Sequence, residues 1–233
     1  LSIPPDCEDL NEYLRRFDLP ISLLQTKESI SEAFYLVQEK LIAQNVIYAE
    51  LRFAPQSFMQ RGLSQRKVIE AALDGLSRSH LSSSIILCCM RGPEREKANL
   101  ETVQLAKEYL TTHDGITALD LAGAEGLFAT SDYRELFSLA SKLDVPFTLH
   151  AGEAAGADSV RCAIEMGARR IGHGVRAFED DALLSLLKGN QIPLELCPTS
   201  NRQTKVVSDM KTYPLSDFVK RELAVTLNTD NPA

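Results

Sequence analysis

Val145-Pro146-Phe147-Thr148-Leu149-His150-Ala151-Gly152-Glu153 is the stretch around which the chain is organised. Alternating apolar side chains, with a proline at the head of the run, predict a short β-strand. His150 falls at the C-terminal tip of that strand, and Glu153 follows a glycine that permits a tight turn. An imidazole and a carboxylate delivered to one end of a sheet indicate a functional site. For this stretch alone, a buried hydrogen-bonded histidine beside a solvated glutamate is the alternative.

Runs of the same kind recur along the chain and alternate with segments of helical periodicity. The predicted strands cover residues 46–55, 84–90, 116–123, 146–150, 169–174, 192–198 and 223–230. The predicted helices cover residues 10–17, 29–43, 64–80, 98–111, 131–143, 156–166, 179–189 and 214–221. Strands that alternate with helices in this way predict βαβ units and a parallel sheet.

Seven such strands predict an α/β fold, a TIM-type (β/α)8 barrel of which this chain covers about strands 2–8. A doubly wound open sheet is the alternative. It would need a glycine-rich phosphate turn after an early strand, and the sequence contains none. We therefore expect residues 1–233 to be a single catalytic barrel domain, incomplete at the N-terminus (the first strand) and at the C-terminus (the final helices).

Charge and composition exclude several classes of partner. The formal net charge is −7, and no cluster of Lys and Arg interleaves with aromatic residues. Binding to nucleic acid or to an anionic membrane surface is therefore disfavoured. The apolar runs are too short to span a bilayer. Five cysteines without a CxxC spacing, together with no signal-peptide pattern, favour a reducing cytoplasm. The sequence predicts no particular oligomeric state.

Polar residues gather at the ends of the predicted strands. They are Glu50 and Arg52, Asp120 and Gly123, His150 and Glu153, His173, Ser200 and Asn201, and Asp230 and Asn231. The C-terminal ends of barrel strands converge on one mouth, where active sites of such enzymes lie. We therefore expect these side chains to meet.

Each main candidate has a chemical role and a rival. His150 suits a Zn²⁺ or similar ion, or is a hydrogen-bonded core residue. Asp230 would complete a ligand set or cap a following helix. Glu153 suits a proton shuttle to substrate. His173 would orient the attacking hydroxide or polarise the substrate, with metal ligation as its rival role. Gly123 offers a bare backbone N–H to a ligand, or is a simple turn glycine.

One further residue is given no catalytic role. Cys197 is interpreted as a packing residue and not a nucleophile. Pro198 follows it, and no helix start is predicted there to activate the thiol.

Six motifs in order resemble the adenosine deaminase family over about residues 46–231. They are Tyr48-Ala49-Glu50-Leu51-Arg52-Phe53-Ala54-Pro55, Asp120-Leu121-Ala122-Gly123-Ala124-Glu125, Thr148-Leu149-His150-Ala151-Gly152-Glu153, Ile171-Gly172-His173-Gly174, Leu194-Glu195-Leu196-Cys197-Pro198-Thr199-Ser200-Asn201 and Leu227-Asn228-Thr229-Asp230. The resemblance implies a metal-dependent hydrolase barrel that carries one Zn²⁺ per subunit.

The resemblance also assigns roles to residues. His150 and Asp230 match zinc ligands, and Glu153 matches the residue that protonates N1 of the purine. His173 matches the imidazole that orients the attacking hydroxide. Gly123 matches a backbone contact to the purine. The residues that match supporting positions behind the site are Asp120, Ser200 and Asn201.

Two departures from the family pattern stand out. The family has a His-x-His pair on its first strand that supplies two further zinc ligands, and no histidine precedes residue 46 here. We expect the native protein to have roughly 50 or more further N-terminal residues that include this strand. Second, Asn231 stands where well-known members have an aspartate that holds a purine ring nitrogen. An amide can donate or accept there, so we expect Asn231 to tune affinity or pH dependence rather than abolish activity.

The expected reaction is hydrolytic deamination of adenosine or 2′-deoxyadenosine to inosine or 2′-deoxyinosine plus ammonia, in purine salvage. The partner is then a small purine nucleoside. Deamination of another 6-aminopurine, such as adenine or AMP, is the nearest alternative. A metal-free degenerate barrel that acts as a binding protein is an alternative of another class. The H-x-E with P-C-x-x-C signature of nucleobase deaminases is absent, which argues against a nucleic-acid editor.

Overall fold

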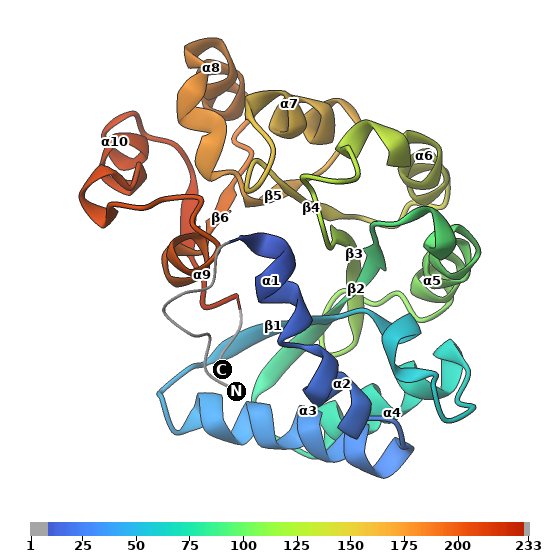
Figure 1. Cartoon of the computed structure of the whole chain (residues 1–233). Helices are drawn as coiled ribbons and strands as arrows, with labels where there is room; N and C mark the ends of the chain where they lie inside the picture. The colour runs from blue at the N-terminus through green and yellow to red at the C-terminus, as the bar shows by residue number, and fades with distance from the viewer. Residues whose placement is uncertain (1–8, 231–233) are drawn as a thin grey trace. The chain divides into compact units, whose positions relative to one another are not determined.

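The computed structural model describes residues 9–230, which divide into two compact units. Unit 1 contains residues 9–17, 121–138 and 147–230, and unit 2 contains residues 18–120 and 139–146. Parallel strands alternate with helices along the chain in both (Figure 1). No helix among residues 9–230 is long and apolar enough to cross a membrane.

Unit 2 is built on a three-stranded sheet in the order β1-β2-β3. Its strands are β1 (Tyr48–Phe53), β2 (Ser82–Met90) and β3 (Ile116–Ala122), the last of which also gives two residues to unit 1. The pair β1 and β2 is parallel, with Tyr48 opposite Ser82 and Phe53 opposite Leu87. Every residue of β2 from Ser83 to Cys89 is buried, as expected for a parallel strand that is covered on both faces.

Helices cover this sheet, and two of them, α3 and α4, begin at side-chain caps. Those of unit 2 are α2 (Asp18–Leu23), α3 (Lys27–Ile42), α4 (Gln65–Ser77) and α5 (Glu96–Glu108). A capping box formed by Thr26 and Ser29 starts α3, and the Ser64 side chain accepts the Lys67 N–H at the start of α4. The helices α3 and α4 lie side by side (Figure 1). At Gly75 they approach so closely that an added Cβ would lie 2.2 Å from the Ser31 carbonyl oxygen.

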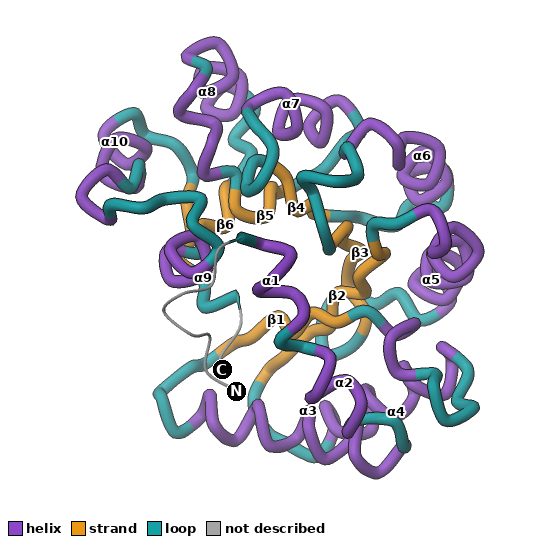
Figure 2. The backbone as a smooth tube through the Cα atoms, viewed as in Figure 1, coloured by secondary structure: helices purple, strands orange, loops and turns teal. Residues whose placement is uncertain are grey.

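Unit 1 is built on a four-stranded parallel sheet in the order β4-β5-β6-β7. Its strands are β4 (Thr148–Ala151), β5 (Arg170–His173), β6 (Leu194–Leu196) and β7 (Val225–Leu227). Its helices are α1 (Leu10–Arg15), α7 (Ala157–Glu165), α8 (Asp181–Gly189), α9 (Pro198–Gln203) and α10 (Leu215–Lys220). Figure 2 shows β4, β5 and β6 side by side, with α7 and α8 on one side of them. The carboxyl ends of these strands carry the residues of the candidate site.

The remaining elements are short or shared between the units. Helix α6 (Arg134–Lys142) gives residues to both. Single 3₁₀ turns are η1 (Pro55–Phe58), η2 (Pro93–Arg95), η3 (Thr130–Tyr133), η4 (Val175–Glu179) and η5 (Met210–Thr212).

Most predicted elements are confirmed, with boundaries that shift by a few residues. All seven predicted strands are present among residues 9–230, and each predicted helix has its counterpart. The α/β alternation is therefore confirmed. Two six-residue helices, α2 and α9, were not predicted. Because α9 begins at Pro198 directly after Cys197, the expectation that no helix starts there is wrong. The buried Cys197 thiol donates to the Glu195 carbonyl.

The close approach at Gly75 can be tested by adding one methyl group. An alanine in a helix is normally about 1 kcal/mol more favourable than glycine. Here the contact with the Ser31 carbonyl should prevail, because overpacking costs about 1–3 kcal/mol. We expect Gly75→Ala to lower the free energy of unfolding, measured by urea denaturation.

Gly189→Ala is the matched control. Gly189 ends α8, and an added Cβ would meet nothing within 4 Å. This variant should be unchanged or slightly more stable. Equal effects of the two substitutions would contradict the packing described for α3 and α4.

Candidate active site

The turn after β4 brings Glu153 into the interior of unit 1. Gly152 has a φ of +72°, and a Cβ at this position would lie 2.4 Å from Cγ2 of Val160. Only glycine satisfies both the left-handed backbone and the lack of space. The chain therefore turns sharply between His150, which is half-buried on β4, and the buried Glu153.

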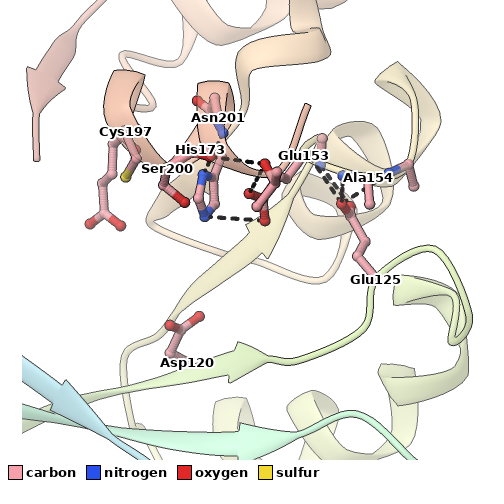
Figure 3. A network of polar contacts seen from close by, with 12 residues as sticks. Asp120, Glu125, Glu153, Ala154, His173, Cys197, Ser200 and Asn201 are labelled. Carbon is pink, nitrogen blue, oxygen red and sulfur yellow. Dashed lines mark hydrogen bonds and ion pairs between the residues drawn. The ribbon is translucent and has the colours of Figure 1, made fainter. Parts of the chain in front are cut away.

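The carboxylate of Glu125 holds this turn together. Its Oε1 accepts the Gly152 N–H at 2.7 Å, and its Oε2 accepts the backbone N–H groups of Glu153, Ala154 and Ala155 at 3.0, 2.7 and 3.0 Å. The Ser159 hydroxyl donates to the same carboxylate. Glu125 is only 3% exposed, and Figure 3 shows its carboxylate aimed at the turn. Successive N–H groups that converge on one anion form a nest.

Glu153 is buried in a setting that favours its protonated form. Burial is the main cause that raises the pKa of the Glu153 carboxyl, and the imidazole of His173 opposes that shift. The Thr204 hydroxyl donates to Oε1 at 3.2 Å, and Nε2 of His173 lies 3.5 Å from Oε2. A carboxyl whose pKa is raised by burial holds its proton more readily and is suited to act as a general acid.

His173 ends β5 in a strained backbone conformation. Its φ is +60°, and that of the following Gly174 is +62°. A left-handed non-glycine residue is uncommon and often marks a functional position. The ring is 2% exposed and lies between two polar partners (Figure 3). Nδ2 of Asn201 is 3.0 Å from Nδ1, and Glu153 faces Nε2.

Three candidate ligands meet in unit 1. His150, His173 and Asp230 each offer one ligand atom, and these atoms lie within 4.8 Å of one another. The rings of His150 and His173 have centroids 5.0 Å apart. Asp230 is exposed, and its φ is +59°. Imidazole nitrogens and a carboxylate oxygen fit a zinc ion or a similar divalent cation.

The structure brings together six of the predicted residues, all in unit 1. These are His150, Glu153, His173, Ser200, Asn201 and Asp230. Ser200 and Asn201 stand in the short helix α9, and both are buried. The Ser200 Oγ has no hydrogen-bond partner among residues 9–230.

For three other predicted residues even the placement at the site stays a prediction, as do the roles of all the residues predicted here. Asp120 belongs to unit 2, where it is fully buried and forms an ion pair of 3.0 Å with Arg52. Gly123 has a φ of +108°, which is compatible with both the contact and the turn interpretations. Asn231 lies outside the described residues.

Sequence reasoning did not assign roles to Glu125, Thr204 or Tyr213. Glu125 is the last residue of the Asp120–Glu125 motif, and its position just after a strand end could have indicated a site residue. Its partners, however, lie 27 to 34 residues further along the chain. Thr204 and Tyr213 follow α9, which was itself not predicted. No spacing in the sequence indicates that the Tyr213 hydroxyl reaches Asn201.

Comparison with known proteins shows the family to which this chain belongs. A family model described as adenosine deaminase matches residues 3–233. An adenosine deaminase of Haemophilus ducreyi is 52% identical over 237 residues, which cover 99% of this chain and 69% of that protein. The chain belongs to the adenosine deaminase family. The family is metal-dependent and consists of hydrolases.

Solved structures confirm the fold class of this family member as a partial (β/α) barrel. An adenine deaminase from Arthrobacter aurescens aligns with a TM-score of 0.89 and 26% identity, covering 98% of this chain and 70% of that one. An N6-methyl-AMP deaminase from Arabidopsis thaliana aligns with a TM-score of 0.80 and 28% identity, covering 96% and 68%.

The role of Glu125 leads to a prediction about stability. Glu125→Gln would place an amide N–H2 against backbone N–H groups that now have an acceptor. Each buried group left unsatisfied costs about 1–3 kcal/mol. We expect a lower free energy of unfolding and loss of adenosine turnover, measured by urea denaturation and by an activity assay.

Glu165→Gln is the control for that substitution. Glu165 forms an exposed ion pair with Arg134 on α6, and such pairs contribute about 0–1 kcal/mol. It should keep both stability and turnover. A Glu125→Gln protein as stable and active as the Glu165→Gln protein would contradict the role given to the carboxylate.

Proposed function

We propose that the protein hydrolyses adenosine and 2′-deoxyadenosine to inosine and 2′-deoxyinosine with release of ammonia. One observation carries this proposal. A buried Glu153 with a raised pKa lies beside His173 and a cluster of candidate cation ligands, in a chain 52% identical to an adenosine deaminase. Water adds to C6 of the purine, and the amino group leaves as ammonia.

The cofactor we propose is one Zn²⁺ per subunit. His150 and Asp230 would hold it. A catalytic zinc site needs three protein ligands, so a third would come from His173 or from a His-x-His pair, which these 233 residues do not contain. The ion, when bound, supplies Lewis-acid chemistry that lowers the pKa of water toward about 7.

Protein side chains would do the rest of the chemistry. Glu153 delivers a proton to N1 of the purine, which makes C6 more electrophilic, and burial of this carboxyl favours the protonated form that donates. His173 orients the attacking water through its ring nitrogen on the Glu153 side.

The remaining predicted residues would serve the substrate or support the site. The backbone N–H of Gly123 and the amide of Asn231 contact the purine. Asp120, Ser200 and Asn201 support the reacting groups. Asn201 does so through its 3.0 Å contact with His173.

We place this reaction in the cytoplasm. Cys88, Cys89, Cys162 and Cys197 are all free thiols and all buried, as is typical of proteins in a reducing compartment. Burial also raises the pKa of the Cys88 and Cys89 thiols, so they resist oxidation.

The proton-delivery role can be tested with one isosteric substitution. Glu153→Gln keeps the shape of the side chain but cannot donate an acidic proton. General acid catalysis contributes about 10²–10⁴-fold, so we expect kcat to fall by that order. The ultraviolet change on conversion of adenosine to inosine measures it, in the complete metal-loaded protein. Adenine and AMP, tested alongside, should be converted poorly. Preference for either would move the substrate to another 6-aminopurine.

Removal of the metal tests the same site independently. A chelator should abolish turnover, and added Zn²⁺ should restore it with about one ion bound per chain. Undiminished deamination by metal-free protein would contradict the proposed chemistry. A protein that binds purine but holds no metal and converts no substrate would instead be the degenerate binding barrel.

A further inference from the structure

Tyr213 contacts the candidate site indirectly, through Asn201. It lies between the 3₁₀ turn η5 and helix α10, and its side chain is half-buried. Its hydroxyl donates to Oδ1 of Asn201 at 3.0 Å. Nδ2 of the same amide is 3.0 Å from Nδ1 of His173. A continuous chain of polar contacts therefore runs from Tyr213 through Asn201 to His173 and on to Glu153.

Tyr213 is the donor in its hydrogen bond with Asn201, and its other contact, with Cys197, fits that direction. The backbone N–H of Cys197 donates to the phenolic oxygen. The hydroxyl hydrogen points away from that contact and is donated to Oδ1 of Asn201. Burial raises the pKa of Tyr213, which keeps that hydrogen in place. The atom of Asn201 that faces a donated hydrogen must be its carbonyl oxygen.

This orientation of the amide fixes a proton on His173. With the oxygen turned toward Tyr213, the NH₂ group of Asn201 faces Nδ1 of the imidazole. Because an NH₂ group only donates, Nδ1 must accept, and the proton of the neutral ring lies on Nε2. Nε2 faces the Glu153 carboxylate at 3.5 Å, which can accept that proton in a hydrogen bond. The contact with Glu153 is compatible with a proton on Nε2, and the orientation of the Asn201 amide is what requires it.

An asparagine amide does not by itself prefer either orientation, since its oxygen and nitrogen ends have nearly the same shape. If the amide turned over, its oxygen would face His173 and draw the proton to Nδ1. The ring would then present a bare Nε2 to the Glu153 carboxylate.

We propose that Tyr213 is a positioning residue that, through Asn201, holds His173 as the Nε2–H tautomer. His173 then serves as a hydrogen-bond donor beside the cation site, because an Nε2 that carries a proton is not free to bind a metal ion. The tautomer follows from the contacts alone. Its consequence for turnover rests on the proposed deamination.

The tautomer can be measured directly by NMR of the complete, zinc-loaded protein labelled with ¹⁵N-histidine. These 233 residues contain four histidines, and the signal lost in His173→Gln identifies that residue among all the ring signals. We expect the native protein to show Nε2–H at His173. In Tyr213→Phe the amide loses its fixed partner, so we expect both tautomers. In Asn201→Asp the carboxylate can only accept, so the proton should move to Nδ1.

Kinetics supply a second readout. Tyr213→Phe should lower kcat for adenosine by about tenfold while KM changes little, because the substrate contacts remain and one hydrogen-bonded orientation is lost. Tyr109→Phe is the matched control, since that hydroxyl bonds to Arg66 and Glu70 in unit 2. It should keep the His173 tautomer and the turnover of the native protein.

Two results would overturn the inference. One is a native protein that shows Nδ1–H at His173, and the other is a Tyr213→Phe protein that keeps Nε2–H fully populated. The first needs no variant, so the test survives a substitution that fails to fold. A protein with the expected tautomers but no turnover of adenosine would instead overturn the proposed function and leave this inference standing.

Discussion

The candidate site depends on one buried carboxylate. Four consecutive backbone N–H groups, from Gly152 to Ala155, point at Glu125. Left without an acceptor, these N–H groups would each cost about 1–3 kcal/mol, and the left-handed turn that aims them inward would not persist. With the acceptor in place, these hydrogen bonds hold the turn, which presents Glu153 to His173. Glu125 thus positions the proposed acid without itself taking part in proton transfer.

At the end of β5, supporting residues likewise hold a reacting group in place. His173 has a left-handed backbone that an ordinary strand end would not adopt, so neighbouring groups must hold it there. Asn201 and Tyr213 supply that support from α9 and the segment after it. (β/α) barrels support many chemistries with this arrangement. The strand ends carry the reacting groups, and residues of the following loops hold those groups in place.

The sequence predicted the framework and the main reacting groups because both depend on local signals. Apolar runs indicate the strands, and the ends of parallel strands lie at the same edge of a sheet. The sequence alone therefore predicted that four side chains lie close together, those of His150, Glu153, His173 and Asp230. The supporting residues could not be found in this way. Glu125 and Tyr213 act through hydrogen bonds to residues 12 to 34 positions away, and no periodicity encodes such pairs. Helix α9 has six residues, which are too few for a periodic pattern. Because this helix was not predicted, the position of Cys197 at a helix start was missed.

Amide hydrogen exchange in the turn tests this account most directly. If the Glu125 carboxylate holds the turn, the amides of residues 152 to 155 should exchange as slowly as those of β4 and β5, although they belong to no strand or helix. Exchange at the rate of an exposed loop would show that these hydrogen bonds open freely in solution. The turn would then not position Glu153, and the central claim would be wrong.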